Sequence, residues 1–111
     1  MAEIASRKEE SAKENRLDRT FIRLRDEWKR ARRHESSTQR MVMLMPYQRI
    51  IGLGPDVVPL ILRELEQQPD MWFWALRALT EADPVTEDMR GDVQAMARLW
   101  LEWGKAQGYQ W

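Results

Sequence analysis

The chain of 111 residues contains no cysteine and a single histidine, His34. The absence of cysteine excludes disulfide bonds, zinc sites built on thiolates and catalysis by a thiol nucleophile. The lone histidine stands between Arg33 and Glu35, with no second imidazole at a metal-ligating spacing. We therefore expect no metal, no cofactor and no catalytic residue, and we predict that the protein is not an enzyme.

Long apolar runs are also missing. No stretch approaches the ~18 residues that a membrane-spanning helix needs, and residues 1–7 contain no apolar segment typical of a secretory signal. These absences predict a cytoplasmic protein without membrane association. The length corresponds to one compact domain, with too few residues for a second independent core.

Glycine and proline are absent from the first 40 residues, and all five of each lie in the remainder. Charge divides at the same place, because residues 1–40 hold 12 Lys and Arg against 8 Asp and Glu, whereas residues 41–111 hold 6 against 10. The net charge of zero is thus a cancellation between a basic and an acidic part. This pattern predicts an all-α fold, with a long basic N-terminal helix before a compact domain of about four to five helices.

The basic helix carries a narrow apolar stripe. Its members, spaced by three or four residues, are Leu17, Phe21, Leu24, Trp28 and Ala31. A stripe this short is insufficient for a free-standing coiled coil, so docking on the protein's own domain is preferred to docking on a second copy, and the oligomeric state stays open. The predicted units are a solvated or disordered tail over 1–16, a basic amphipathic helix over 17–35 and a compact helical domain over 36–111.

Candidate helix N-caps precede the apolar segments of the second part. They are the hydroxyl residues 36–38 and the carboxylates of Asp56, Asp70 and Asp92. The residues predicted to form the core are Val58, Leu62, Leu65, Leu76, Leu79, Met96, Ala97 and Trp100. Gly104 lies on the apolar stripe of the last helix, where the missing side chain permits close approach by another element.

Six tryptophans are an unusual number for a chain of this length. On a helix the side chains of Trp72 and Trp74 point about 160° apart, so burial of one tends to expose the other. Large aromatic residues dominate the hot spots of protein interfaces, and we expect an exposed aromatic surface, with an aromatic-rich core as the alternative. The candidate interface residues are Trp72, Trp74, Arg77, Trp103 and Trp111.

A basic cluster in the N-terminal helix supports a second hypothesis. Its members are Arg23, Arg25, Lys29, Arg30, Arg32 and Arg33. A helix of this charge density can neutralise several phosphates, so nucleic-acid binding is the alternative function. Asp18, Asp26, Glu27 and Glu35 are interleaved with these residues, which makes internal ion pairs on a solvated helix face the competing structural interpretation.

One part of the chain resembles a HEAT-type helical hairpin. Residues 54–65 correspond to its first helix and residues 74–79 to its second. No second copy follows at the ~40-residue period of a solenoid, so the resemblance implies a single hairpin inside a small domain rather than a repeat array.

Three further segments resemble a set of small bacterial proteins that has no established activity. They are YQRIIG at 47–52, WFWALRA at 72–78 and WLEWG at 100–104, within a likeness that covers roughly residues 27–111. The resemblance transfers no catalytic residues. With the size and class of the chain, it suggests a protein that binds a partner encoded by a neighbouring gene, as the antitoxin-like or adaptor member of a bacterial two-component, defence or mobile-element system.

Overall fold

Helices make up all the regular structure of the computed structural model, which describes residues 2–111, with side chains from Lys8 onward. The six α-helices of this range are α1 (Ala2–Ala31), α2 (Thr38–Met43), α3 (Met45–Gly52), α4 (Val58–Gln67), α5 (Phe73–Thr80) and α6 (Val93–Ala106). Three short 3-10 helices span Arg32–His34, Pro55–Val57 and Glu87–Met89. The predicted all-α fold is confirmed.

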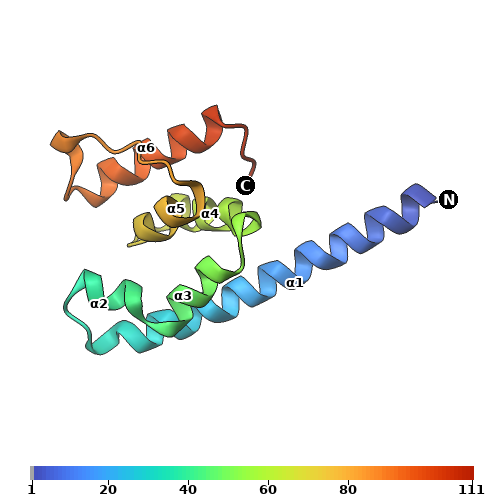
Figure 1. Cartoon of the computed structure of the whole chain (residues 1–111), viewed down its shortest axis with the longest axis horizontal. Coiled ribbons are helices and arrows are strands. Elements are labelled where there is room, and N and C mark those ends of the chain that lie inside the picture. Colours follow the sequence, from blue (N-terminus) through green and yellow to red (C-terminus); the bar gives the residue numbers. More distant parts are fainter. Residues whose placement is uncertain (1) are drawn as a thin grey trace.

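The helices form three layers (Figure 1). α1 packs along α3, with α2 following in the same layer, while α4 and α5 lie in the middle and α6 covers the opposite side. The N-terminal half of α1 extends well beyond the other helices, and the molecule measures 53 × 32 × 22 Å along its principal axes. None of the helices in the described range is long and apolar enough to cross a bilayer.

The C-terminal half of α1 is part of the core. Phe21, Leu24 and Trp28 are buried, and the indole N–H of Trp28 donates a hydrogen bond of 2.8 Å to the carbonyl of Met41. This arrangement confirms that the apolar stripe docks on the protein's own domain. These three side chains belong to the same core cluster as buried residues of the later helices.

Residues 2–16 continue α1 as a helix, where the sequence predicts a tail outside the helical segment. The side chains from Lys8 to Arg16 are all exposed, so this part of the helix is solvated, as expected. No glycine or proline interrupts it, and Glu9 precedes Lys13 by four residues, the spacing at which opposite charges support a helix.

Deletion of residues 1–16 is expected to lower the melting temperature by less than about 3 °C, because the described side chains of this segment bury almost no apolar surface. Thermal unfolding followed by circular dichroism measures the change. A loss of more than about 5 °C would mean that the segment supports the domain, which would contradict the prediction.

An aromatic cluster fastens α1 and α3 to the start of α5. Its members are Phe21, Trp28, Tyr47 and Trp72. The ring of Trp72 lies 4.8 Å from that of Trp28 and stacks on Tyr47 with an interplanar angle of 11°. The Tyr47 hydroxyl accepts a hydrogen bond from the N–H of Ala75 and donates one to the carbonyl of Met71. Burial raises the pKa of Tyr47, so this hydroxyl keeps its proton and both bonds at neutral pH.

Most of the predicted core is buried. Val58, Leu62, Leu65, Leu76, Ala97 and Trp100 are buried, whereas Leu79 and Met96 are half-buried and pack against the core. The prediction leaves out the aromatic cluster, since a helix period identifies an apolar face without showing which faces meet.

Helix α6 follows the sequence prediction closely. The Asp92 carboxylate accepts a hydrogen bond of 3.1 Å from the N–H of Ala95 and caps the helix. A Cβ atom at Gly104 would lie 2.8 Å from a methyl carbon of Leu62 and 3.1 Å from the ring of Trp111. The predicted close approach at Gly104 is therefore real, and it lets both α4 and the C-terminal residues pack against α6.

Two of the predicted caps are wrong. Asp56 lies in the 3-10 helix that precedes α4 and makes no capping hydrogen bond. Asp70 does not cap α5, because its two carboxylate oxygens accept hydrogen bonds of 2.6 and 2.8 Å from the guanidinium of Arg32. These charge-assisted, bidentate bonds join the 3-10 helix after α1 to the middle layer. The same carboxylate also accepts a hydrogen bond of 2.7 Å from the N–H of Met71, which lies before α5.

Candidate protein-binding groove

An apolar groove of about 360 Å³ opens between α2, α5 and α6. Its apolar lining consists of Val42, Met43, Met71, Phe73, Trp74 and Met96. Arg77 is the one ionisable residue of the lining. A recess with so few convergent polar groups is suited to receive apolar side chains rather than to position reacting atoms.

Two large side chains beside the groove are exposed. The exposed fraction is 51% for Met43 and 43% for Trp74, which is the most exposed of the six tryptophans. Neighbouring apolar side chains on a soluble surface are typical of a binding site. Met45, at 64%, is the third exposed large apolar residue among the side chains from Lys8 onward, and it does not line the groove.

The exposure of Trp74 follows from the burial of Trp72. Trp72 has helical backbone angles directly before α5, so the two indoles point in nearly opposite directions, as predicted. Trp72 enters the aromatic cluster and is completely buried. Trp74 is therefore directed away from the core.

The exposed residues Met43 and Met45 lie on either side of the break between α2 and α3. The Ser37 hydroxyl caps α2 by accepting a hydrogen bond of 3.4 Å from the N–H of Arg40, as the sequence predicts for this hydroxyl segment. Leu44 has an extended backbone, and Pro46 opens α3. The side-chain amide of Gln48 donates a hydrogen bond of 2.7 Å to the carbonyl of Val42, which fixes the end of α2 beside the groove.

Arg77 gives the groove a cationic rim. Its guanidinium carbon lies 5.8 Å from the centroid of the Trp74 ring, and the side chain is exposed. None of the ion pairs formed by side chains from Lys8 onward involves Arg77. Its charge is thus available to a carboxylate of a bound molecule.

The candidate interface residues differ in how far they are exposed. Trp72 is buried and is not accessible to a partner. Trp103 is half-buried and packs between Trp100 and Tyr109, at centroid distances of 5.3 and 5.7 Å. Trp111 is half-buried and folds back toward Gly104. Neither Trp103 nor Trp111 lines the groove, so only Trp74 and Arg77 of the five are brought together there.

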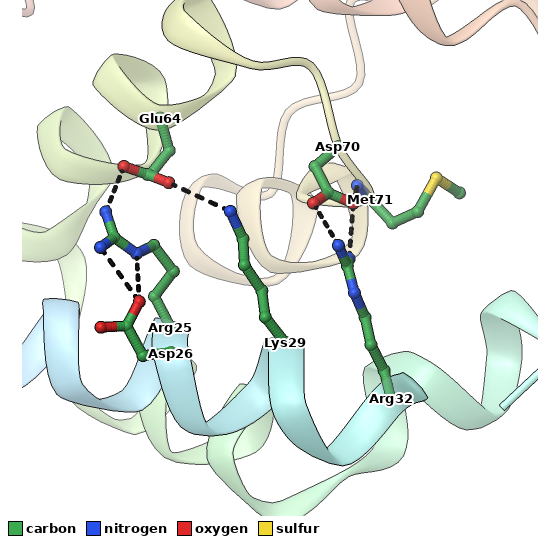
Figure 2. Close-up of polar contacts among 7 residues, drawn as sticks. All are labelled: Arg25, Asp26, Lys29, Arg32, Glu64, Asp70 and Met71. Carbon is green, nitrogen blue, oxygen red and sulfur yellow. Dashed lines mark hydrogen bonds and ion pairs between the residues drawn. The ribbon is translucent and has the colours of Figure 1, made fainter. Parts of the chain in front are cut away.

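Half of the predicted basic cluster is directed at the protein's own domain (Figure 2). Arg25 and Lys29 reach the carboxylate of Glu64 on α4, at 2.8 and 4.0 Å. Arg32 forms the bidentate pair with Asp70. These three cations therefore pair with carboxylates of the middle layer, whereas Arg23, Arg30 and Arg33 are exposed.

Arg32 has a second contact within the protein. Its guanidinium carbon lies 4.3 Å from the centroid of the Trp28 ring, a cation–π geometry. The indole of Trp28 is itself buried in the aromatic cluster. The side chain of Arg32 is thus fixed from two sides.

Two carboxylates between α5 and α6 are engaged in ion pairs. Asp83 and Glu87 accept hydrogen bonds of 2.9 and 3.1 Å from Arg90. The hydrogen bond from Arg90 holds the pKa of Asp83 below its ordinary value, so this carboxylate is a poor general acid or base near neutral pH. His34 is exposed, and residues with described side chains include no group of three acidic, His or Cys residues that could hold a metal ion.

A second and larger recess, of about 900 Å³, lies between the projecting half of α1 and the start of α4. Leu17, Leu60 and Trp111 contribute apolar surface to it. A salt bridge of 2.6 Å between Asp18 and Arg63 joins its two walls. It contains none of the exposed large apolar side chains, which makes the Trp74 groove the stronger candidate.

Comparison of the chain with protein-family models, curated proteins and solved structures gives no match. The likeness to small bacterial proteins therefore remains a prediction from the three segments alone.

Proposed function

We propose that the protein is a non-enzymatic interaction module, which binds the apolar face of an acidic segment of a partner protein in the groove between α2, α5 and α6. The observation that carries this proposal is the exposure of Trp74 and Met43 on the two sides of one apolar recess. Tryptophan supplies a large rigid contact area, while methionine adapts its shape to the partner.

The chemistry of the rim supports an acidic segment. Arg77 lies beside the Trp74 indole and carries the only charge in the lining. An incoming carboxylate would meet this guanidinium while apolar side chains enter the recess, and complementary charge would fix the orientation of the segment. An adaptor or antitoxin-like role in a bacterial system is the biological setting that we propose for this binding.

The test compares three full-length variants. Trp74→Ala and Met43→Ala remove groove side chains, whereas Met45→Ala removes a more exposed methionine outside the lining. Each variant, carrying an affinity tag, is used to recover partners from the host, and the product of the neighbouring gene is examined first. Calorimetric titration with the purified partner then measures the affinity.

Trp74→Ala is expected to weaken binding by about 30-fold, equivalent to ~2 kcal/mol for an interface hot spot. Met43→Ala should have a smaller effect in the same direction, and Met45→Ala should bind like the wild type. If every recovered partner binds Trp74→Ala as tightly as the wild type, the groove is not the binding site and the proposal fails.

A further inference from the structure

A row of arginines lies on the solvent face of the N-terminal helix, where the side chains do not contribute to the core. The row, here called the arginine ridge, consists of Arg16, Arg19, Arg23 and Arg30 of α1 and Arg33 of the 3-10 helix that follows it, at spacings of three, four, seven and three residues. Such spacings keep side chains on one side of a helix. All five residues are exposed, while the buried stripe of Phe21, Leu24 and Trp28 faces the core.

Ion pairing separates the ridge from the other cations of α1. Figure 2 shows Arg25, Lys29 and Arg32 extending toward carboxylates of the middle layer. Among side chains from Lys8 onward, none of the ion pairs involves Arg16, Arg19, Arg30 or Arg33. Arg23 pairs only with Glu27, with 60% of its side chain exposed. Besides Glu27, Asp26 lies beside the row, and Arg25 binds it at 3.0 Å.

We infer that the arginine ridge is a binding surface for the phosphate backbone of a nucleic-acid duplex. Every cation of the ridge is arginine, whose planar guanidinium binds phosphate through two parallel hydrogen bonds. At ~1.5 Å per residue the ridge is about 25 Å long, which is most of one ~34–36 Å turn of a duplex. A straight row of this length can contact several phosphates at once.

The surroundings of the ridge favour a duplex over a single strand. Single-stranded nucleic acids are bound by stacking of their bases on exposed aromatic rings. The two aromatic residues of α1, Phe21 and Trp28, are completely buried. No stacking platform accompanies the ridge, so the contacts are to phosphates and are independent of base sequence.

The ridge is also unsuited to inserting into a lipid bilayer. Membrane-surface helices combine basic residues with exposed apolar side chains that enter the bilayer. Between Lys8 and His34 no apolar side chain larger than alanine is exposed. An acidic protein surface carries negative charge as a phosphate backbone does. The experiment therefore includes poly-glutamate as a probe.

The experiment measures binding of the full-length protein to a fluorescent 20-base-pair duplex, as DNA and as RNA, over a series of salt concentrations. With four or five phosphates contacted, log Kd should change by about 3–5 for each tenfold increase in salt. The variant Arg19→Gln/Arg30→Gln should reduce that slope by about 2 and weaken binding at low salt by at least tenfold. Both side chains are exposed and outside the ion pairs described above, so the variant should keep its melting temperature.

A matched control carries the same change in net charge on the opposite layer. Arg98→Gln/Lys105→Gln alters two exposed residues of α6, which Figure 1 places across the middle layer from α1. This control and Trp74→Ala should both bind the duplex like the wild type. An equal loss in the α6 control would show a general charge effect and overturn the inference.

Three further probes decide the class of ligand, namely a single strand of equal length, poly-glutamate and vesicles containing phosphatidylserine. Each is expected to bind more weakly than the duplex at the same salt concentration. Tighter binding of the single strand, or equal binding of poly-glutamate or the vesicles, would overturn the assignment to a duplex. A negative result for duplex binding at the ridge would leave the proposal for the groove standing, because Trp74 and Met43 are tested with a different ligand.

Discussion

Replacement of Trp72 by alanine is expected to lower the free energy of unfolding by about 3–5 kcal/mol, the cost of truncating a large buried aromatic side chain. Trp72 is completely buried and contacts the rings of Phe21, Trp28 and Tyr47. Its removal leaves a cavity between α1, α3 and α5 that rigid neighbouring rings cannot fill. Urea unfolding followed by circular dichroism measures the loss.

Trp74→Ala is the matched control for this variant, since it truncates the same residue type two positions away. Because 43% of the Trp74 surface is exposed, Trp74→Ala should lower the free energy of unfolding by less than about 1 kcal/mol. Equal losses for the two variants would show that Trp74 also supports the fold, and a small loss for Trp72→Ala would show that the aromatic cluster is not central.

The second large effect is expected at Arg25, where replacement by methionine should cost about 2–3 kcal/mol of unfolding free energy. Its partner Glu64 is 7% exposed and would lose its closest cation, leaving only Lys29 at 4.0 Å. The loss stays below the range for a fully buried pair because the Arg25 side chain is 23% exposed and water screens part of its charge.

A double replacement distinguishes the cost of leaving the Glu64 carboxylate buried without its partner from the contribution of the Arg25–Glu64 pair to the free energy of unfolding. Arg25→Met/Glu64→Leu removes both charges and should recover much of the stability, as replacement of buried ion pairs by apolar residues often does. Arg23→Met breaks the exposed pair with Glu27 and should change stability by less than about 0.5 kcal/mol. Chemical denaturation of the wild type and the three variants measures each free energy of unfolding. A double variant no more stable than Arg25→Met would contradict this account.

The features that could be predicted from the sequence are those set by neighbouring residues. The Asp92 cap, the close approach at Gly104 and the opposite directions of Trp72 and Trp74 all follow from residues within one or two helical turns. Helix period and capping chemistry act over the same distance. For that reason the sequence predicts the helical fold class and most of the core residues of α4 and α6.

The features that could not be predicted depend on residues far apart in the chain. The carboxylates that bind Arg25 and Arg32 lie 39 and 38 residues away, whereas the sequence offers only neighbouring acids as partners. The same limit applies to Trp72, since the direction of an indole can be inferred locally but the surface that covers it cannot. Local patterns therefore identify Trp74 and Arg77, which line the groove, but they do not identify the carboxylates that pair with Arg25, Lys29 and Arg32.

The aromatic cluster also constrains the order in which the chain can fold during synthesis. Phe21 and Trp28 are made long before Trp72, the ring that covers both of them. At ~5–20 residues per second, roughly 2–9 s separate the addition of residues 28 and 72 on the ribosome. Throughout that interval α1 can be helical, but the aromatic side chains of its apolar stripe lack the ring that covers them in the folded protein. Docking of the first helix is thus a late event of translation.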